Sequence, residues 1–234
     1  MALPRIRPLR TSARRIREFW DQDRGLSVFL LLLVVVVFIL APASNPLPGR
    51  RNLFIVFISA LFGFGGFAVA RTRVIGVTVL VLAAAPVLLH TAGRPGADDR
   101  WEAASALAAC AFAVTLALLV AGRVLRGGAV TVHHIIGAVA IYLLIGVAFG
   151  EATRAMGLLD PEAYKSASGR TVERAELYYF SFVTLTTVGY GDITPAARLT
   201  QSLATLEALV GQLYPVVILA RLVSLDVEDR KRGL

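Results

Sequence analysis

The sequence predicts an all-α membrane protein with six transmembrane helices and one shorter re-entrant helix in each chain. Hydrophobic residues make up 56% of the 234 positions and charged residues only 17%, whereas about 45–50% apolar residues are usual for a soluble domain. The charged residues lie between long uncharged runs, and a helix that crosses a bilayer needs roughly 20 apolar residues. One further apolar segment is too short to span, and such a segment is tolerated at membrane depth only when protein surrounds it.

Residues 1–25 carry seven arginines, with Ile16, Phe19 and Trp20 on one apolar face. A basic amphipathic segment of this kind is typical of the membrane interface, where it contacts anionic lipid. The formal net charge of +8 therefore indicates arginines at segment ends, and we do not expect nucleic-acid binding.

Residues 26–126 are expected to form a four-helix transmembrane domain. Its predicted spans are 26–41, 53–70, 74–91 and 101–120. The basic start and the sequence Ala41-Pro42-Ala43 also fit a secretory signal with a cleavage site. Acidic and aromatic residues within the long basic region favour a retained first span instead.

The remainder of the chain is expected to contain two more spans, at 132–149 and 199–225, and a short helix at 176–186. Residues 150–174 are polar and rich in helix breakers, which predicts a loop outside the hydrocarbon. Residues 226–234 would form a short tail. Six spans place both termini on one side, and that side holds fifteen of the 24 basic residues. The excess predicts that both termini are cytoplasmic.

The stretch between the short helix and the last span carries the clearest chemical signal. Gly189 and Gly191 can take left-handed φ at little steric cost, while we expect ordinary φ at Thr187, Val188 and Tyr190. Successive carbonyls, together with the Thr187 hydroxyl, could then face one line. Such a column of oxygen atoms can replace the hydration shell of a monovalent cation.

The sequence Thr187-Val188-Gly189-Tyr190-Gly191-Asp192 resembles the selectivity filter of tetrameric potassium channels. The segments around it follow the same order as the pore module of that family, and the whole chain resembles the small prokaryotic six-span members. The resemblance implies a pore domain at 127–225, with outer helix 132–149, pore helix 176–186, filter 187–191 and inner helix 199–225. It also implies a homotetramer, because one filter segment cannot encircle an ion.

The resemblance assigns roles by matching position. K⁺ would bind along the filter, at Thr187, Val188, Gly189, Tyr190 and Gly191. Further residues would support the filter and cavity or bend the inner helix: Thr186 at the cavity entrance, Asp192 behind the outer mouth and braced by Tyr179, Gln212 facing the cavity, and Gly211 and Pro215 as gating hinge candidates. Gly211 and Pro215 could equally be packing features, and Gln212 could bond a neighbouring helix.

Glu207 is the one acidic residue within the sixth span. An ionisable residue inside a membrane usually has a functional role and a specific partner. We expect a partner on the pore helix or behind the filter, such as the Thr184 hydroxyl, and a role in filter stability or a structural hydrogen bond.

These features predict a potassium-selective channel of the cell membrane that conducts K⁺ passively, without an organic cofactor or enzymatic activity. The alternatives are a pore subunit of a potassium uptake transporter and a structural membrane protein with a closed pore. The fourth span lacks arginine between Ala103 and Gly122, and each sensor charge contributes about 2.3 kcal/mol per 100 mV. We therefore expect weak or absent voltage dependence.

Overall fold

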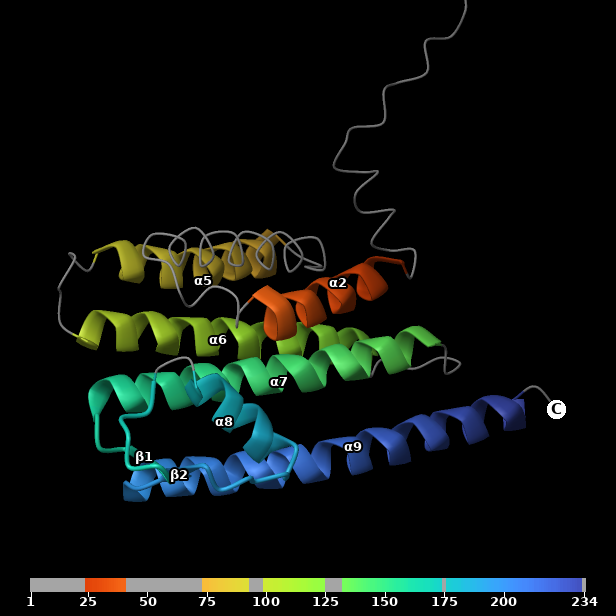
Figure 1. The fold of residues 1–234 in the computed structure, drawn as a ribbon. Coiled ribbons are helices and arrows are strands. Elements are labelled where there is room, and N and C mark those ends of the chain that lie inside the picture. Colours follow the sequence, from red (N-terminus) through yellow and green to blue (C-terminus); the bar gives the residue numbers. More distant parts are fainter. Residues whose placement is uncertain (1–23, 41–72, 93–98, 125–131, 174–175, 233–234) are drawn as a thin grey trace, which may run out of the picture.

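The computed structural model describes residues 24–40, 73–92, 99–124, 132–173 and 176–232, and the statements below concern these residues. Long helices lie nearly parallel, and one short helix is set between two of them (Figure 1). The elements in chain order are α2 (Arg24–Val35), the π-helical turn η1 (Val36–Leu40), α5 (Arg73–Ala92), α6 (Asp99–Val124), α7 (Val132–Leu159), β1 (Tyr164–Ser166), α8 (Glu176–Leu185), β2 (Ile193–Pro195) and α9 (Arg198–Arg232).

Three of the described helices contain a stretch that is long and apolar enough to cross a membrane. These stretches are Asp99–Gly122 in α6, His134–Leu159 in α7 and Arg198–Arg221 in α9. Shorter apolar stretches occupy Ser27–Ile39 and Val74–Leu89. The expected second span at 53–70 and most of the basic segment at 1–25 lie outside the described residues. A mostly helical membrane protein is thus confirmed, and the count of six spans stays a prediction.

Two helices extend beyond the bounds expected from sequence. α7 continues to Leu159 instead of ending at 149, so the expected loop at 150–174 is wrong for its first ten residues. The charges there are accommodated in the helix because Arg154 forms an ion pair with Glu151 at 2.8 Å. α9 runs to Arg232, so most of the expected tail is helical, since no glycine or proline interrupts residues 226–232.

The buried core joins α2, α5, α6 and α7. Leu33, Val79, Leu116 and Leu144 are among its best-buried side chains. Small side chains on α6 allow close approach of the helices. The buried alanines of α6 are Ala103, Ala106, Ala113 and Ala117. By contrast, only 11% of the membrane-length stretch of α9 is buried, against 50% for α7. α9 therefore presents most of its apolar surface outward.

Two three-residue strands connect the segment after α7 with the segment before α9. β1 pairs with β2 in antiparallel register, with Lys165 opposite Thr194, and the pair lies at the end of the bundle where α9 begins (Figure 1). Tyr164 packs edge-on against Phe180 of α8 at a centroid distance of 5.3 Å. The sheet thus ties the polar segment after α7 to the residues that follow position 192.

Candidate functional site

Positive φ angles alternate along residues 187–191. Gly189 has φ +55° and Gly191 has φ +76°, as the sequence predicts, but Thr187 also has φ +59°. The expectation of ordinary φ at Thr187 is therefore wrong. Positive φ at every second residue, with ordinary φ at Val188 and Tyr190 between them, is the pattern that turns successive carbonyls toward one side. A non-glycine residue in this region costs about 1–3 kcal/mol and persists only where its surroundings impose it.

The surroundings of Thr187 are the last carbonyls of α8. The Thr187 amide donates to the Thr184 carbonyl at 2.9 Å, and the Val188 and Gly189 amides donate to the Val183 carbonyl at 3.0 and 3.3 Å. These bonds satisfy carbonyls that a helix C-terminus leaves without partners. They also fold the start of the 187–191 segment back against its helix. Thr186 is held in the same way, because its hydroxyl donates to the Phe182 carbonyl at 2.7 Å.

α8 is seated on α7 by two glycines one turn apart. A Cβ on Gly146 would come within 2.6 Å of the Phe182 ring, and one on Gly150 within 2.7 Å of the Tyr178 ring. The Tyr178 hydroxyl donates to Glu151, the same carboxylate that pairs with Arg154. Aromatic side chains of α8 thus fill a groove on α7, and a polar cluster closes one end of it.

The end of the segment at Asp192 is held from three sides. The Asp192 carbonyl accepts from the Ala167 amide at 2.8 Å, and its carboxylate accepts from the Ile193 amide at 3.1 Å. The Tyr179 ring stacks on Tyr190 at 6.4 Å with an interplanar angle of 6°. Burial and a hydrogen bond to Asp192 raise the pKa of the Tyr179 hydroxyl above its ordinary value. Tyr179 therefore interacts with both Tyr190 and Asp192.

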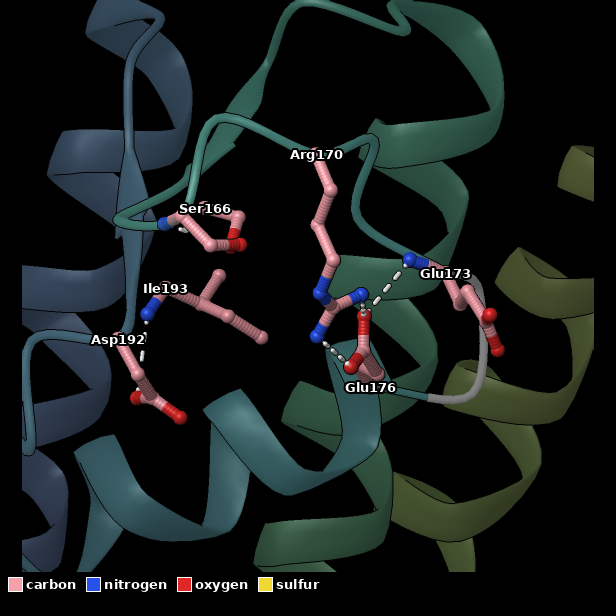
Figure 2. A network of polar contacts seen from close by, with 7 residues as sticks. Ser166, Arg170, Glu173, Glu176, Asp192 and Ile193 are labelled. Atoms are coloured by element: carbon pink, nitrogen blue, oxygen red, sulfur yellow. Dashed lines mark hydrogen bonds and ion pairs between the residues drawn. The ribbon is translucent and has the colours of Figure 1, made fainter.

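The N-terminal part of α8 is held by a network that lies near Asp192 (Figure 2). Arg170 bonds Glu176 with both of its terminal nitrogens, one of them at 2.8 Å. The Glu176 carboxylate also accepts from the Glu173 amide at 2.9 Å, as the acidic residue of a capping box does. The Arg170 hydrogen bond lowers the pKa of Glu176 below its ordinary value. This network holds the first described turn of α8 to the segment that precedes it.

The buried side of α8 meets α9 at Glu207 and Gly211. Glu207 is fully buried and accepts a hydrogen bond from the Ser181 hydroxyl. The partner lies on the short helix, as expected, but it is Ser181 rather than Thr184, because Ser181 lies one turn earlier on the face that meets α9. A Cβ on Gly211 would lie 1.8 Å from the Leu185 carbonyl oxygen, so Gly211 marks a close approach of two backbones.

The structure does not bring every expected residue to this site. Gln212 and Pro215 are exposed on α9 in the single chain, and α9 continues as one helix through Pro215. Several contributors were missed by sequence reasoning: Tyr142, Glu151, Arg154, Arg170, Glu176, Tyr178 and Ser181. Glu151 and Arg154 could have been found as a pair at helical spacing, but the partners across helices depend on the packing.

Comparisons with known proteins cover the same part of the chain. Residues 129–226 match the family described as ion channel. The protein described as "Two pore potassium channel c" from Oryza sativa subsp. japonica is 36% identical over 90 residues, which are 38% of this chain. The chain covers 18% of that protein's length. No solved structure matches the present chain. The C-terminal part of this membrane protein is therefore similar to an ion channel domain and to part of a potassium channel.

Proposed function

We propose that this chain is the pore-forming subunit of a potassium-selective channel, in which four copies surround a filter made of residues 187–191. The observation that carries the proposal is the alternation of positive φ at Thr187, Gly189 and Gly191. This geometry suits a column of inward carbonyls, and carbonyl rings of this kind coordinate K⁺ in place of water. K⁺ would pass down its gradient without chemical coupling.

Surface exposure supports an assembly around the filter. In the single chain Val188 is 52% exposed and Tyr190 is 70% exposed. α9 also leaves large apolar side chains uncovered, among them Leu206, Leu209, Leu213, Val216 and Val217. One chain supplies oxygen atoms from one side only, whereas an ion in a filter is coordinated from all sides. A homotetramer is the closed arrangement that supplies the other sides.

The direction of α8 supports the same function. Its C-terminal end, at Leu185, lies directly before the filter. The partial negative charge at a helix C-terminus favours a cation nearby, so four such helices would stabilise K⁺ in a central cavity. If the chain has six spans, the excess of basic residues on the side of the termini supports cytoplasmic termini and an Asp192 end that faces outside the cell.

A channel is favoured over a subunit of an uptake transporter. Both the matching family and the relative are described as ion channels. The polar groups of the site lie in helix contacts and in the filter segment.

The test is K⁺ and Na⁺ flux in liposomes that hold the full chain. Gly189→Ala places a side chain at φ +55° inside the filter, whereas Gly169→Ala does so at φ +74° in an exposed loop. In both positions a Cβ would meet no atom within 4 Å in the single chain. The two variants therefore differ in their position along the chain and not in steric crowding.

We expect K⁺ flux without Na⁺ flux in the native chain, loss of K⁺ flux in Gly189→Ala and native flux in Gly169→Ala. Equal K⁺ and Na⁺ flux in the native chain would refute selectivity. Unchanged flux in Gly189→Ala would refute the filter.

A further inference from the structure

Three helices of one chain meet behind the filter in two layers. In each helix the two contributing residues are four positions apart, which places them on one face, one turn apart. The six residues are Tyr142 and Gly146 on α7, Ser181 and Leu185 on α8, and Glu207 and Gly211 on α9. We call this set the three-helix seam.

The first layer of the seam is a polar contact in a dry environment. Ser181 and Glu207 are both fully buried. The Ser181 hydroxyl lies 3.5 Å from the Gly146 carbonyl and donates to Oε1 of Glu207. Oε2 of Glu207 has no hydrogen-bond partner among the described residues. Glu207 therefore engages α8 through one oxygen atom acting as an acceptor.

The second layer converges on a single backbone atom. The Leu185 carbonyl oxygen accepts from the Tyr142 hydroxyl at 3.3 Å and touches the backbone of Gly211 so closely that a Cβ would lie 1.8 Å away. Leu185 is the last residue of α8 and is fully buried. Because Thr187 follows two residues later, any shift of this carbonyl moves the base of the filter.

Through the three-helix seam, α9 contacts the last turn of α8, which leads directly into the filter of the same subunit. The bonds that impose positive φ on Thr187 run to carbonyls of the last turn of α8. That last turn is held on one side by Tyr142 and on the other by Gly211. A hydrogen bond buried away from water is costly to lose, so the Ser181–Glu207 contact fixes the level at which α9 meets α8.

We propose that Glu207 and Gly211 are positioning residues that lock the last turn of α8 to α9, so that the position of α9 sets the geometry of the filter. The inference rests on the proposed function, because its readout is selectivity. Glu207 acts as a hydrogen-bond acceptor, a role that a glutamine keeps and a leucine lacks. Gly211 acts as a contact surface at this level, in addition to any bending of α9.

The experiment compares Glu207→Leu, Glu207→Gln, Ser181→Ala and the double variant Glu207→Leu/Ser181→Ala with the native chain. Thr115→Ala is the matched control, because among the described residues the Thr115 hydroxyl bonds the Ala111 carbonyl of its own helix, at 2.8 Å, and no other helix. Two properties are measured: the K⁺-to-Na⁺ permeability ratio, and the rise in melting temperature when Na⁺ is replaced by K⁺. A purely structural contact would lower the melting temperature equally in both salts.

We expect Glu207→Leu and Ser181→Ala each to lower the permeability ratio severalfold, because loss of this buried hydrogen bond lets the last turn of α8 shift. Both should also reduce the K⁺-specific rise in melting temperature. The double variant should be no worse than Glu207→Leu, since both remove one contact. Glu207→Gln and Thr115→Ala should keep native values.

Two results would overturn the inference: native permeability in both Glu207→Leu and Ser181→Ala, or a Glu207→Gln variant as impaired as Glu207→Leu. If Glu207→Leu does not fold, Ser181→Ala decides alone, because it removes only an oxygen atom. A native chain without K⁺ preference would instead refute the proposed function, so the two failures are distinguishable.

Discussion

At the scale of single residues, the backbone at Thr187 shows where local preference yields to surroundings. Glycines at 189 and 191 predict positive φ from sequence, because glycine adopts it without a steric penalty. No sequence signal predicts φ +59° at Thr187, because a β-branched residue avoids that region. The carbonyls of Val183 and Thr184 impose it through the amides of residues 187–189. Likewise, Glu207 predicts a partner on the pore helix, but the register between α8 and α9 decides that the partner is Ser181.

Gly211→Ala tests the close contact with Leu185. A methyl group 1.8 Å from a carbonyl oxygen forces α8 and α9 apart, and overpacking of this kind costs about 1–3 kcal/mol. We expect a lower melting temperature and loss of K⁺ flux. Gly122→Ala on α6 is the control, since a Cβ there would meet no atom within 4 Å. Native stability in Gly211→Ala would contradict the contact.

At the scale of elements, apolar runs and breaker residues predict where helices lie better than where they end. α7 extends ten residues past its expected end because Glu151 and Arg154 pair within the helix, which a count of charges does not show. β1 and β2 escape prediction because three-residue strands have no periodicity. The short helix expected at 176–186 is present over Glu176–Leu185, where a polar segment changes to an aromatic one.

The Arg170–Glu176 pair at the start of α8 gives a pH-dependent prediction. Arg170 lowers the pKa of Glu176 from its ordinary value of 4.5, so the folded state binds this proton less tightly than the unfolded state. The pair therefore stabilises the fold fully above pH 4.5, and the contribution is lost as the pH falls through the lowered pKa. Both groups are near the surface, so the effect is small and weakens with salt.

Melting temperatures of Arg170→Met and of the native chain, measured across acidic pH, check this expectation. Arg170→Met should melt below the native chain at neutral pH, and the difference should shrink below pH 4.5. Lys165→Met, at an exposed position on β1, controls for the loss of a positive charge in the same region. A difference that does not change with pH would argue against the pair.

At the scale of the whole molecule, hydropathy alone predicts a helical membrane protein, and the described helices confirm it. How helices from different copies meet is beyond both hydropathy and a single chain. We expect copies to meet on α9, because its apolar side chains stay uncovered while α2, α5, α6 and α7 share a buried core. Among the described residues, α2, α5 and α6 pack with α7, and most of the apolar surface of α9 is left uncovered.

This arrangement predicts that the purified chain is a tetramer. Native mass spectrometry in detergent should give four times the 25.1 kDa mass of one chain. Leu213→Arg, at a side chain that is 58% exposed on α9, should weaken the tetramer, because it puts a charge where neighbouring copies meet. Leu118→Arg on α6, 69% exposed, should leave the tetramer intact by comparison. A native chain that stays monomeric would contradict the assembly.

The central claim is potassium selectivity through residues 187–191. Its most direct test is the reversal potential of the native channel in a planar bilayer with K⁺ on one side and Na⁺ on the other. We predict a current that reverses close to the equilibrium potential of K⁺, because carbonyl rings would replace the hydration shell of K⁺. A current that reverses near zero would show that both cations pass equally, and would contradict the account.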